Sequence, residues 1–366
     1  MASARDHEHM ARALRLAARP WRNTDPNPRV GCVIVKDDRV VGEGFHARAG
    51  GPHAERVALD AAGDAARGAT AYVTLEPCCH HGRTPPCAPA LIEAGIARVV
   101  CGAVDPNPRV NGGGLSVLAA AGIAVESGVL AAESEALNRG FFSRMRRGRP
   151  WVRSKLAASL DGRTALADGR SQWITSAAAR ADVHRWRARS SAVLTGSGTV
   201  LADDPLLTAR PDDGPADLLQ PLRVIVDSEL QTPRTARTLS AGGEVVIFTT
   251  RDGGGNADAL IAAGARIERV GGVGRCDLGE VIARLGALEV NEVWVEAGPR
   301  LNGALLQARL VDELVLYFAP KLLGDGARGM FALSPLASLD AAPALEIDDV
   351  RRVGDDLRVI ARPRYS

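Results

Sequence analysis

Two short segments of the chain carry residues that could bind a metal ion and move a proton. The first is Pro52-His53-Ala54-Glu55, and the second runs from Glu76 to Cys87 with cysteines at positions 78, 79 and 87. An imidazole and two thiolates suit zinc, and three protein ligands leave a fourth position open for water, as a catalytic site requires. We therefore predict a catalytic zinc site with His53, Cys78 and Cys87 as ligands and Cys79 as a neighbour that does not bind the metal.

Glu55 lies too close to His53 in the sequence to be a further ligand, and a carboxylate suits a second role. Zinc lowers the pKa of its water to about 7, and a nearby carboxylate can take the proton of that water and pass it to a leaving amine. Zinc deaminases share such a His-x-Glu followed by Pro-Cys. Here eight residues separate Cys78 from Cys87 instead of two, so a longer loop must return Cys87 to the metal.

The elements that must position these residues form a first α/β series. At 366 residues the chain is long enough for two domains. Five strands and four helices make up this series, with the first two strands joined as a hairpin, and the pattern predicts a largely parallel sheet covered by helices. We expect the strands near Val30–Val35, Val40–Phe45, Ala71–Leu75, Arg98–Val104 and Ile123–Glu126, and the helices near His7–Arg19, Ala54–Ala66, Ala88–Ala94 and Gly114–Ala121.

A second α/β series begins at Trp151. The stretch Arg144–Pro150 is basic, rich in helix breakers and not periodic, so we place the boundary there, with domains over residues 1–147 and 150–366. Strands are expected at Val152–Leu156, Ala192–Thr195, Leu222–Val226, Val245–Thr250, Glu292–Glu296 and Glu313–Ala319, with helices near Ser176–Arg189, Ala257–Ala263 and Leu278–Leu285. No role is assigned to the tail after Gly324.

The sequence Asp-Pro-Asn-Pro-Arg-Val occurs twice, at residues 25–30 and 105–110. Two X-Pro bonds favour an extended, rigid turn, and the asparagine between them can point its amide at a ligand or at its own backbone. Two interpretations stay open: similar turns at strand ends, or two loops that line one pocket. Asn27 is accordingly a candidate substrate contact.

The composition excludes several classes of function. The chain has no apolar stretch of about 18 residues that could cross a membrane, and charged residues stand near its start where a secretory signal needs an apolar region. A net charge of +2 gives no overall electrostatic attraction to nucleic acid or to a membrane surface. We therefore expect a cytoplasmic protein that acts on a small molecule.

The motifs together resemble the bifunctional riboflavin-biosynthesis deaminase/reductase family. In the first half the resemblance rests on Pro-His-Ala-Glu, Thr-Leu-Glu-Pro-Cys (74–78), His-Gly-Arg-Thr-Pro-Pro-Cys (81–87) and Asp-Pro-Asn-Pro. In the second half it rests on the segments 155–162, 171–175, 198–205 and 295–299. The long cysteine loop is what separates this family from the cytidine and transfer-RNA deaminases.

The resemblance implies a cytidine-deaminase-like α/β/α sandwich followed by a dihydrofolate-reductase-like α/β domain. It implies that the first domain binds Zn²⁺ and removes the C2 amine of 2,5-diamino-6-(5-phosphoribosylamino)pyrimidin-4-one, with Glu55 as the proton shuttle. The second domain would then use NADPH to reduce the ribosyl group to a ribityl chain. We also expect a homo-oligomer, either a dimer or a tetramer.

The resemblance also assigns residues of the second domain. Those expected to contact NADPH are Ala157, Trp173, Thr199, Asp203, Ser228 and the turn formed by Gly298, Pro299, Arg300, Leu301, Asn302, Gly303 and Ala304. Those expected to bind the pyrimidine ribotide are Ser171, Arg187, Leu207, Arg210 and Glu296, with Lys155 as a further candidate. The arginines offer a fork that suits phosphate. No Gly-x-Gly-x-x-Gly fingerprint follows a strand, so NADPH rests on the resemblance.

Two other interpretations compete with this one. A zinc deaminase acting on a nucleic-acid base is disfavoured by the near-neutral charge and the aromatic content of 4%. A purely structural zinc site has no use for Glu55 beside an open position. Arg56 departs from the pattern: an inward side chain would favour the ionised form of Glu55, whereas an outward one would have no effect.

Overall fold

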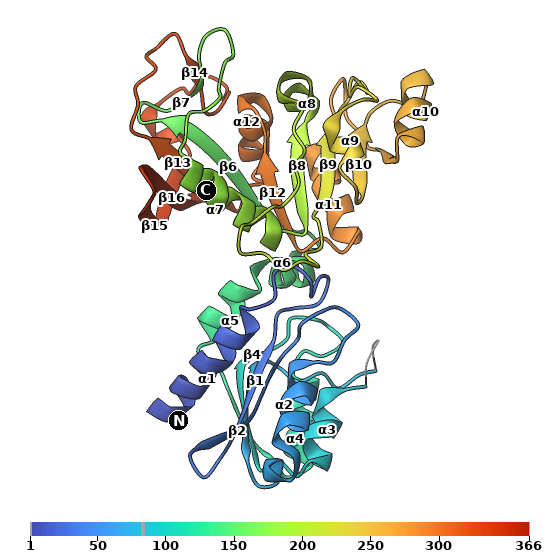
Figure 1. Ribbon diagram of the computed structural model, residues 1–366, viewed down its shortest axis with the longest axis vertical. Helices are drawn as coiled ribbons and strands as arrows, with labels where there is room; N and C mark the ends of the chain where they lie inside the picture. Colours follow the sequence, from blue (N-terminus) through green and yellow to red (C-terminus); the bar gives the residue numbers. More distant parts are fainter. Residues whose placement is uncertain (1, 82–84, 366) are drawn as a thin grey trace. The chain divides into compact units, whose positions relative to one another are not determined.

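The computed structural model describes residues 2–81 and 85–365, so three residues of the cysteine loop, 82–84, lie outside the described residues (Figure 1). The chain divides into two compact units between Gly148 and Arg149. Each unit is built on its own large β-sheet.

The first unit has five strands in the order β2-β1-β3-β4-β5. The strand β1 alone runs in the opposite direction, because it is antiparallel to both of its neighbours, whereas β3, β4 and β5 pair in parallel. Its elements are α1 (Ala4–Ala17), β1 (Gly31–Lys36), β2 (Arg39–Phe45), α2 (Ala54–Ala62), the 3-10 helix η1 (Gly63–Ala66), β3 (Thr70–Leu75), α3 (Cys87–Glu93), β4 (Arg98–Ala103), α4 (Gly113–Ala120), β5 (Ala124–Ser127), α5 (Ala131–Leu137) and α6 (Arg139–Arg147).

Helices cover both faces of this sheet. On one face Met10 and Leu16 of α1 pack against Val33 and Tyr72. On the other face α2, α3 and α4 share an apolar core with β1 and β3. The expected α/β/α sandwich is therefore confirmed.

Cys78 and the two repeated turns predicted from the sequence lie at one edge of the sheet. Since β3 and β4 are parallel and β1 is antiparallel to β3, the start of β1 lies at the same edge as the ends of β3 and β4. The turn at residues 25–28 precedes β1, the turn at 105–108 follows β4, and Cys78 follows β3. Both copies of the repeated sequence thus lie at the edge that carries Cys78.

The second unit has a nine-stranded sheet in the order β11-β10-β9-β8-β12-β6-β13-β16-β15. Neighbouring strands are parallel from β11 to β13, and β16 and β15 complete the sheet in antiparallel fashion. The elements are β6 (Trp151–Ser159), β7 (Arg163–Ala165), α7 (Ala177–Arg189), β8 (Ala192–Gly196), α8 (Ser197–Asp203), β9 (Leu222–Val226), α9 (Arg237–Ser240), β10 (Val245–Thr249), α10 (Gly255–Ala262), β11 (Ala265–Arg269), α11 (Leu278–Ala287), β12 (Glu292–Glu296), α12 (Pro299–Gln307), β13 (Glu313–Ala319), β14 (Arg328–Gly329), η2 (Leu339–Ala341), β15 (Ala344–Val353) and β16 (Asp356–Arg364).

Helices pack on this sheet from both sides. Ile282 of α11 and Leu306 of α12 enter the main apolar core with β12 and β13. Val183 and Trp186 of α7 pack in a separate cluster on Val315 and Tyr317 of β13. The indole of Trp186 is stacked on that of Trp294 with ring centroids 5.4 Å apart.

The segment before the boundary differs from expectation. The sequence predicts no regular structure over Arg144–Pro150, but its first four residues form the last turn of α6. The arginines of this turn interact favourably with the negative end of the helix dipole. Gly148 then ends the helix in a left-handed conformation, with a φ of 67°.

Gly44 of β2 allows α2 to pack closely on this strand. Helix α2 begins next to His53 and carries Glu55 in its first turn. A Cβ on Gly44 would overlap the carbonyl oxygen of Ala54 and lie 2.6 Å from the amide nitrogen of Ala58, both in α2. We predict that Gly44→Ala destabilises the first unit by about 1–3 kcal/mol because backbone has to move. Scanning calorimetry measures this change, and Gly326→Ala, where a Cβ meets open space, serves as control. Equal stability of both variants would contradict the prediction.

Candidate functional site

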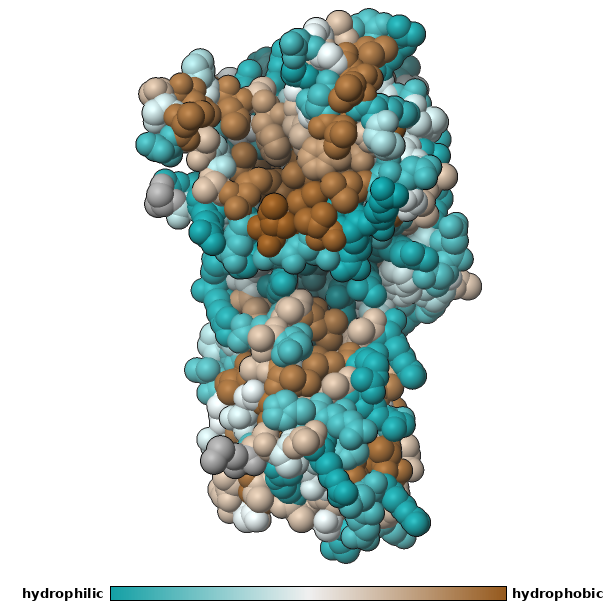
Figure 2. Space-filling model, turned by 90° about the vertical axis from the view of Figure 1, so that its left-hand side faces the viewer, coloured by the Kyte–Doolittle hydropathy of each residue, from teal (hydrophilic) through white to brown (hydrophobic). Residues whose placement is uncertain are grey.

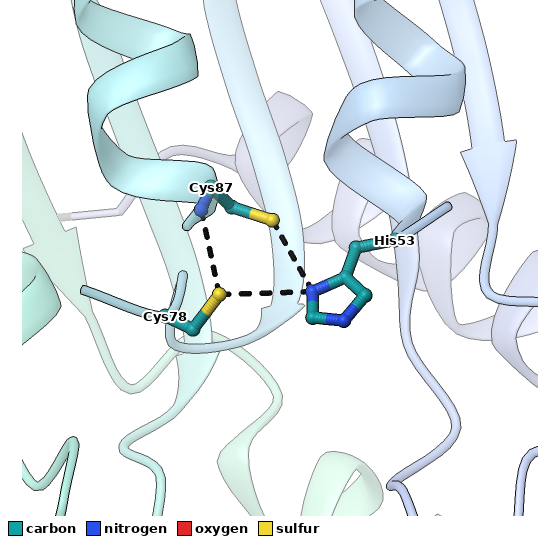
Figure 3. A group of neighbouring side chains, drawn as sticks. All are labelled: His53, Cys78 and Cys87. Atoms are coloured by element: carbon teal, nitrogen blue, oxygen red, sulfur yellow. Dashed lines mark hydrogen bonds between the residues drawn. The ribbon is translucent and has the colours of Figure 1, made fainter. Parts of the chain in front are cut away.

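The three predicted ligands converge at the sheet edge of the first unit (Figure 3). His53 occupies the N-cap position of α2, Cys78 follows β3, and Cys87 is the first residue of α3. The Nδ1 atom of His53 lies 3.6 Å from Sγ of Cys78 and 3.3 Å from Sγ of Cys87. The amide of Cys87 donates a hydrogen bond to Sγ of Cys78 over 3.4 Å.

The spacing of these atoms fits a tetrahedral zinc ion. Ligand distances of about 2.1 Å for nitrogen and 2.3 Å for sulfur correspond to ligand separations of roughly 3.6 Å. All three ligand atoms lie within 4.8 Å of one another, and no other such group is found among the described residues. A hydrogen bond from Cys87 is the main reason that the pKa of Cys78 falls to about 4, and a hydrogen bond from His53 adds to this effect. Burial alone would raise this pKa. The hydrogen bond between the two thiols raises the pKa of Cys87.

Glu55 lies in the first turn of α2 and is 3% exposed. Burial, followed by the charge of Cys78, raises the pKa of its carboxyl group to about 7. Arg56 is exposed, so its charge points away from this carboxyl group. Cys79 is not part of the ligand group, and its Sγ lies 4.0 Å from the carbonyl oxygen of Arg109.

Asn27 is linked to the metal ligands through His46. Nδ2 of Asn27 lies 3.2 Å from Nε2 of His46, while Nδ1 of His46 lies 3.0 Å from the carbonyl oxygen of Pro52. The rings of His46 and His53 meet edge-on at 5.2 Å. Burial lowers the pKa of His46, so its neutral ring donates from Nδ1 to Pro52 and accepts at Nε2 from Asn27. Sequence reasoning missed His46 because a lone histidine after a strand matches no motif.

In the second unit, Arg187, Glu296 and Lys155 form a partly buried cluster of charges. The Nε and Nη2 atoms of Arg187 donate to Glu296 over 2.5 and 2.8 Å, and its Nη1 donates to the carbonyl oxygen of Thr208 over 3.0 Å. Glu296 of β12 stands opposite Lys155 of β6 in the parallel register. Burial lowers the pKa of Lys155, with the attraction of Glu296 opposing it and Arg187 adding to it.

Two more predicted substrate contacts lie on the segment beside this cluster. Leu207 is buried and has a φ of 54°. The guanidinium of Arg210 donates to the hydroxyl of Thr208, and the Arg210 amide donates to Nδ1 of His184 over 3.3 Å. Ser171 lies in the segment before α7 and is half-buried.

The predicted NADPH contacts fall on several elements. Gly298 is the N-cap of α12, and Pro299, Arg300, Leu301, Gly303 and Ala304 lie in the helix. The amide of Asn302 is used within the fold, since it accepts from Ser154 and donates to Ala297. Trp173 is 65% exposed and Arg180 lies 4.5 Å above its ring. Ser228 accepts from the amide of Cys276, while Ala157 lies on β6 and Thr199 and Asp203 lie on α8.

Comparison with known proteins places this architecture in a family. Residues 150–359 match the RibD C-terminal domain, and residues 3–103 match the cytidine and deoxycytidylate deaminase zinc-binding region. The riboflavin biosynthesis protein RibD of Escherichia coli is 51% identical over 361 residues, which cover 96% of this chain and 98% of that protein. This chain belongs to the RibD family. The RibD of Haemophilus influenzae is 48% identical over 99% of this chain and 98% of that protein.

Solved structures of RibD proteins superpose over nearly the whole chain. A RibD structure from Acinetobacter baumannii is 43% identical, covers 98% of this chain and 99% of its own, and has a TM-score of 0.92. The structure of a diaminohydroxyphosphoribosylaminopyrimidine deaminase/5-amino-6-(5-phosphoribosylamino)uracil reductase from Thermotoga maritima is 35% identical over 98% of this chain and 99% of its own, with a TM-score of 0.87.

Family membership decides several predictions. The chain is a bifunctional deaminase and reductase of riboflavin biosynthesis, with a zinc-binding deaminase domain and a reductase domain that uses NADPH. The expected combination of a deaminase fold with a reductase fold is confirmed. Within residues 2–81 and 85–365, none of the helices is long and apolar enough to cross a membrane.

The pairing of Arg187 with Glu296 makes the second unit sensitive to acid. Burial raises the pKa of Glu296, but the Arg187 guanidinium outweighs it and lowers the pKa from 4.5 to about 2. A lowered carboxyl pKa contributes stability above pH 4.5 that is lost as the pH falls toward 2, on the order of 3 kcal/mol in total. We predict that Glu296→Gln abolishes this part of the pH dependence.

Urea unfolding between pH 2.5 and 6, followed by tryptophan fluorescence, measures the effect. The control is Glu229→Gln, which removes an exposed ion pair with Arg251 and should change little. Identical pH profiles for wild type and Glu296→Gln would show that the pair does not contribute as described.

Proposed function

We propose that this chain acts on 2,5-diamino-6-(5-phosphoribosylamino)pyrimidin-4-one in two steps. Residues 1–147 remove the amine at C2, and residues 150–366 reduce the ribosyl group to a ribityl chain. The observation that carries the first step is the convergence of His53, Cys78 and Cys87 beside the buried Glu55. The similarity to the Thermotoga maritima deaminase/reductase, whose name states both activities, supports the substrate and both reactions.

The deaminase residues have separate roles. His53, Cys78 and Cys87 hold the zinc ion, which when bound supplies the Lewis acidity that makes water a nucleophile near neutral pH. Glu55 accepts the proton of that water on its carboxylate and delivers it to the exocyclic nitrogen. The water oxygen forms a C–O bond at C2 before the C–N bond breaks, ammonia leaves, and the second proton of the water ends on the ring nitrogen. A buried carboxyl group beside the zinc ligands is placed for both halves of this transfer.

The reductase step needs a proton donor and a group that holds the substrate. NADPH supplies the hydride that adds to C1′ of the opened ribose. Lys155 delivers the accompanying proton from its ammonium, because burial brings its pKa down from the usual range. Arg210 has an exposed guanidinium and is better placed to bind the phosphate than Arg187, whose fork is paired with Glu296.

The remaining contacts in the second unit are also proposals. Ser171, Leu207 and Glu296 would complete the binding of the substrate in the second unit, whereas Asn27 would contact the substrate of the first unit. Ala157, Trp173, Thr199, Asp203, Ser228 and the residues Gly298, Pro299, Arg300, Leu301, Asn302, Gly303 and Ala304 would surround NADPH. The position of Gly298 at the start of α12 supports this, since a helix N-terminus favours a phosphate group.

We also propose a cytoplasmic homo-oligomer, a dimer or a tetramer. Ile347 and Val350 of β15 stand opposite Ala361 and Val359 of β16, so their side chains share one face of the sheet, while α7 packs on the other face. Ile347 is 62% and Val350 52% exposed. Figure 2 views the side on which β15 and β16 lie in Figure 1 and shows apolar side chains gathered there. A second copy of the chain would cover this face.

Replacement of Glu55 tests the deaminase mechanism. We predict that Glu55→Gln lowers the rate of ammonia release by about 10²–10⁴-fold, because the proton shuttle is lost. The zinc content and the NADPH-dependent reduction of the deaminated substrate should remain those of the wild type. Product masses after incubation with and without NADPH measure both steps, and ammonia release at the wild-type rate would refute the assigned role.

Replacement of Ile347 tests the oligomer. We predict that Ile347→Lys lowers the solution mass to that of one chain at micromolar concentration, because a charge would be buried at the interface. Light scattering measures the mass, and Val273→Lys, at a fully exposed loop position, is the matched control. An Ile347→Lys variant with the mass of the wild-type oligomer would place the interface elsewhere.

A further inference from the structure

Glu76, two residues before the ligand Cys78, has a buried carboxylate that accepts four backbone hydrogen bonds. Its side chain is 4% exposed. The donors are the amides of Asp105 and Gly112 to Oε2, at 3.1 and 2.9 Å, and those of Gly114 and Leu115 to Oε1, at 2.9 and 3.3 Å. One carboxylate therefore holds the loop that leads from β4 into α4.

This carboxylate does for α4 what the N-cap residue usually does. The N-cap of α4 is Gly112, which has no side chain to accept the first amides of the helix. Glu76 supplies these acceptors from a neighbouring segment of the sheet edge, and its charge suits the positive end of the helix dipole. The contact is close, because a Cβ on Gly114 would overlap the carbonyl oxygen of Pro77.

The position of Cys78 depends on two anchors. On the side toward Glu76, the carbonyl oxygen of Pro77 lies in close contact with Gly114 at the start of α4. On the other side, the carbonyl oxygen of Cys78 accepts from the amide of Ala88 at 3.1 Å, and its Sγ accepts from the amide of Cys87. The contacts with Cys87 and Ala88 belong to a segment that itself carries the ligand Cys87. The contact of Pro77 reaches α4, a helix that carries none of the three zinc ligands.

We propose that Glu76 is a positioning residue of the metal centre. By fixing the Glu76–Cys78 turn to the start of α4, it holds Sγ of Cys78 within reach of His53 and Cys87. This inference rests on the proposed assignment of these three residues as zinc ligands. Supporting contacts of this kind change metal affinity by about 10–100-fold when they are removed.

The test compares zinc release from three full-length proteins. Glu76→Gln keeps the shape of the side chain but replaces one acceptor oxygen with an NH₂ group that faces backbone donors. Leu118→Ala opens a cavity under the same helix, since Leu118 of α4 is fully buried, but leaves Glu76 and its partners in place. Zinc transfer to a chromophoric chelator gives the release rate, and the visible spectrum of the cobalt-substituted proteins reports the geometry of the thiolate ligands.

We expect Glu76→Gln to release zinc at least about tenfold faster than the wild type and to alter the cobalt spectrum. Leu118→Ala should keep both near the wild-type values despite its lower thermal stability. An unchanged release rate in Glu76→Gln, or equal acceleration in Leu118→Ala, would overturn the proposal. Wild-type protein that binds no zinc would instead refute the ligand assignment.

A second variant keeps the test open if Glu76→Gln does not fold. Glu76→Asp retains the charge but is one methylene shorter, so it cannot reach all four amides. It should accelerate zinc release by a smaller factor and leave NADPH-dependent reduction by the second unit unchanged. Release at the wild-type rate from a folded Glu76→Asp protein would also count against the proposal.

Discussion

The deaminase unit depends on how the unpaired amides at the starts of its helices are satisfied. The first amides of α3 bond to Cys78, and those of α4 bond to Glu76. Buried amides without partners are costly, so these two helix starts meet acceptors at the sheet edge. Thiolate and carboxylate groups are good acceptors, and the same groups are the ones a zinc-dependent proton transfer needs.

In the second unit, charged side chains are paired within the sheet. Arg187 and Glu296 pair beside Lys155, and Arg153 of β6 pairs with Glu292 and Glu313 on the two adjacent strands. Charges removed from water require partners with good geometry. Parallel register supplies this geometry, because it sets residues of β12, β6 and β13 side by side. Lys155 and Glu296, both proposed to contact the substrate, are therefore fixed by the strands themselves.

The sequence was informative where a motif or a periodicity is local. His53, Glu55, Cys78 and Cys87 were found by residue type and spacing, and most strands by their apolar runs. Glu76 was noted only as part of a motif, because its partners are backbone amides 29–39 residues further along the chain and carry no side-chain signal. The β15–β16 pair was missed because β15 is largely exposed and has charged residues on both faces. The helix α6 was missed because its basic last turn resembled a linker.

The terminal position of β15 has a consequence for how the protein associates. An edge strand offers a row of free backbone groups that can add further strands without limit. Here the strand carries Asp348, Asp349, Arg351 and Arg352, and its register shifts between Ile347 and Asp349. Charges and an irregular register both discourage continuous strand addition. The chain can thus offer an apolar face for a closed assembly while its edge resists growth into fibrils.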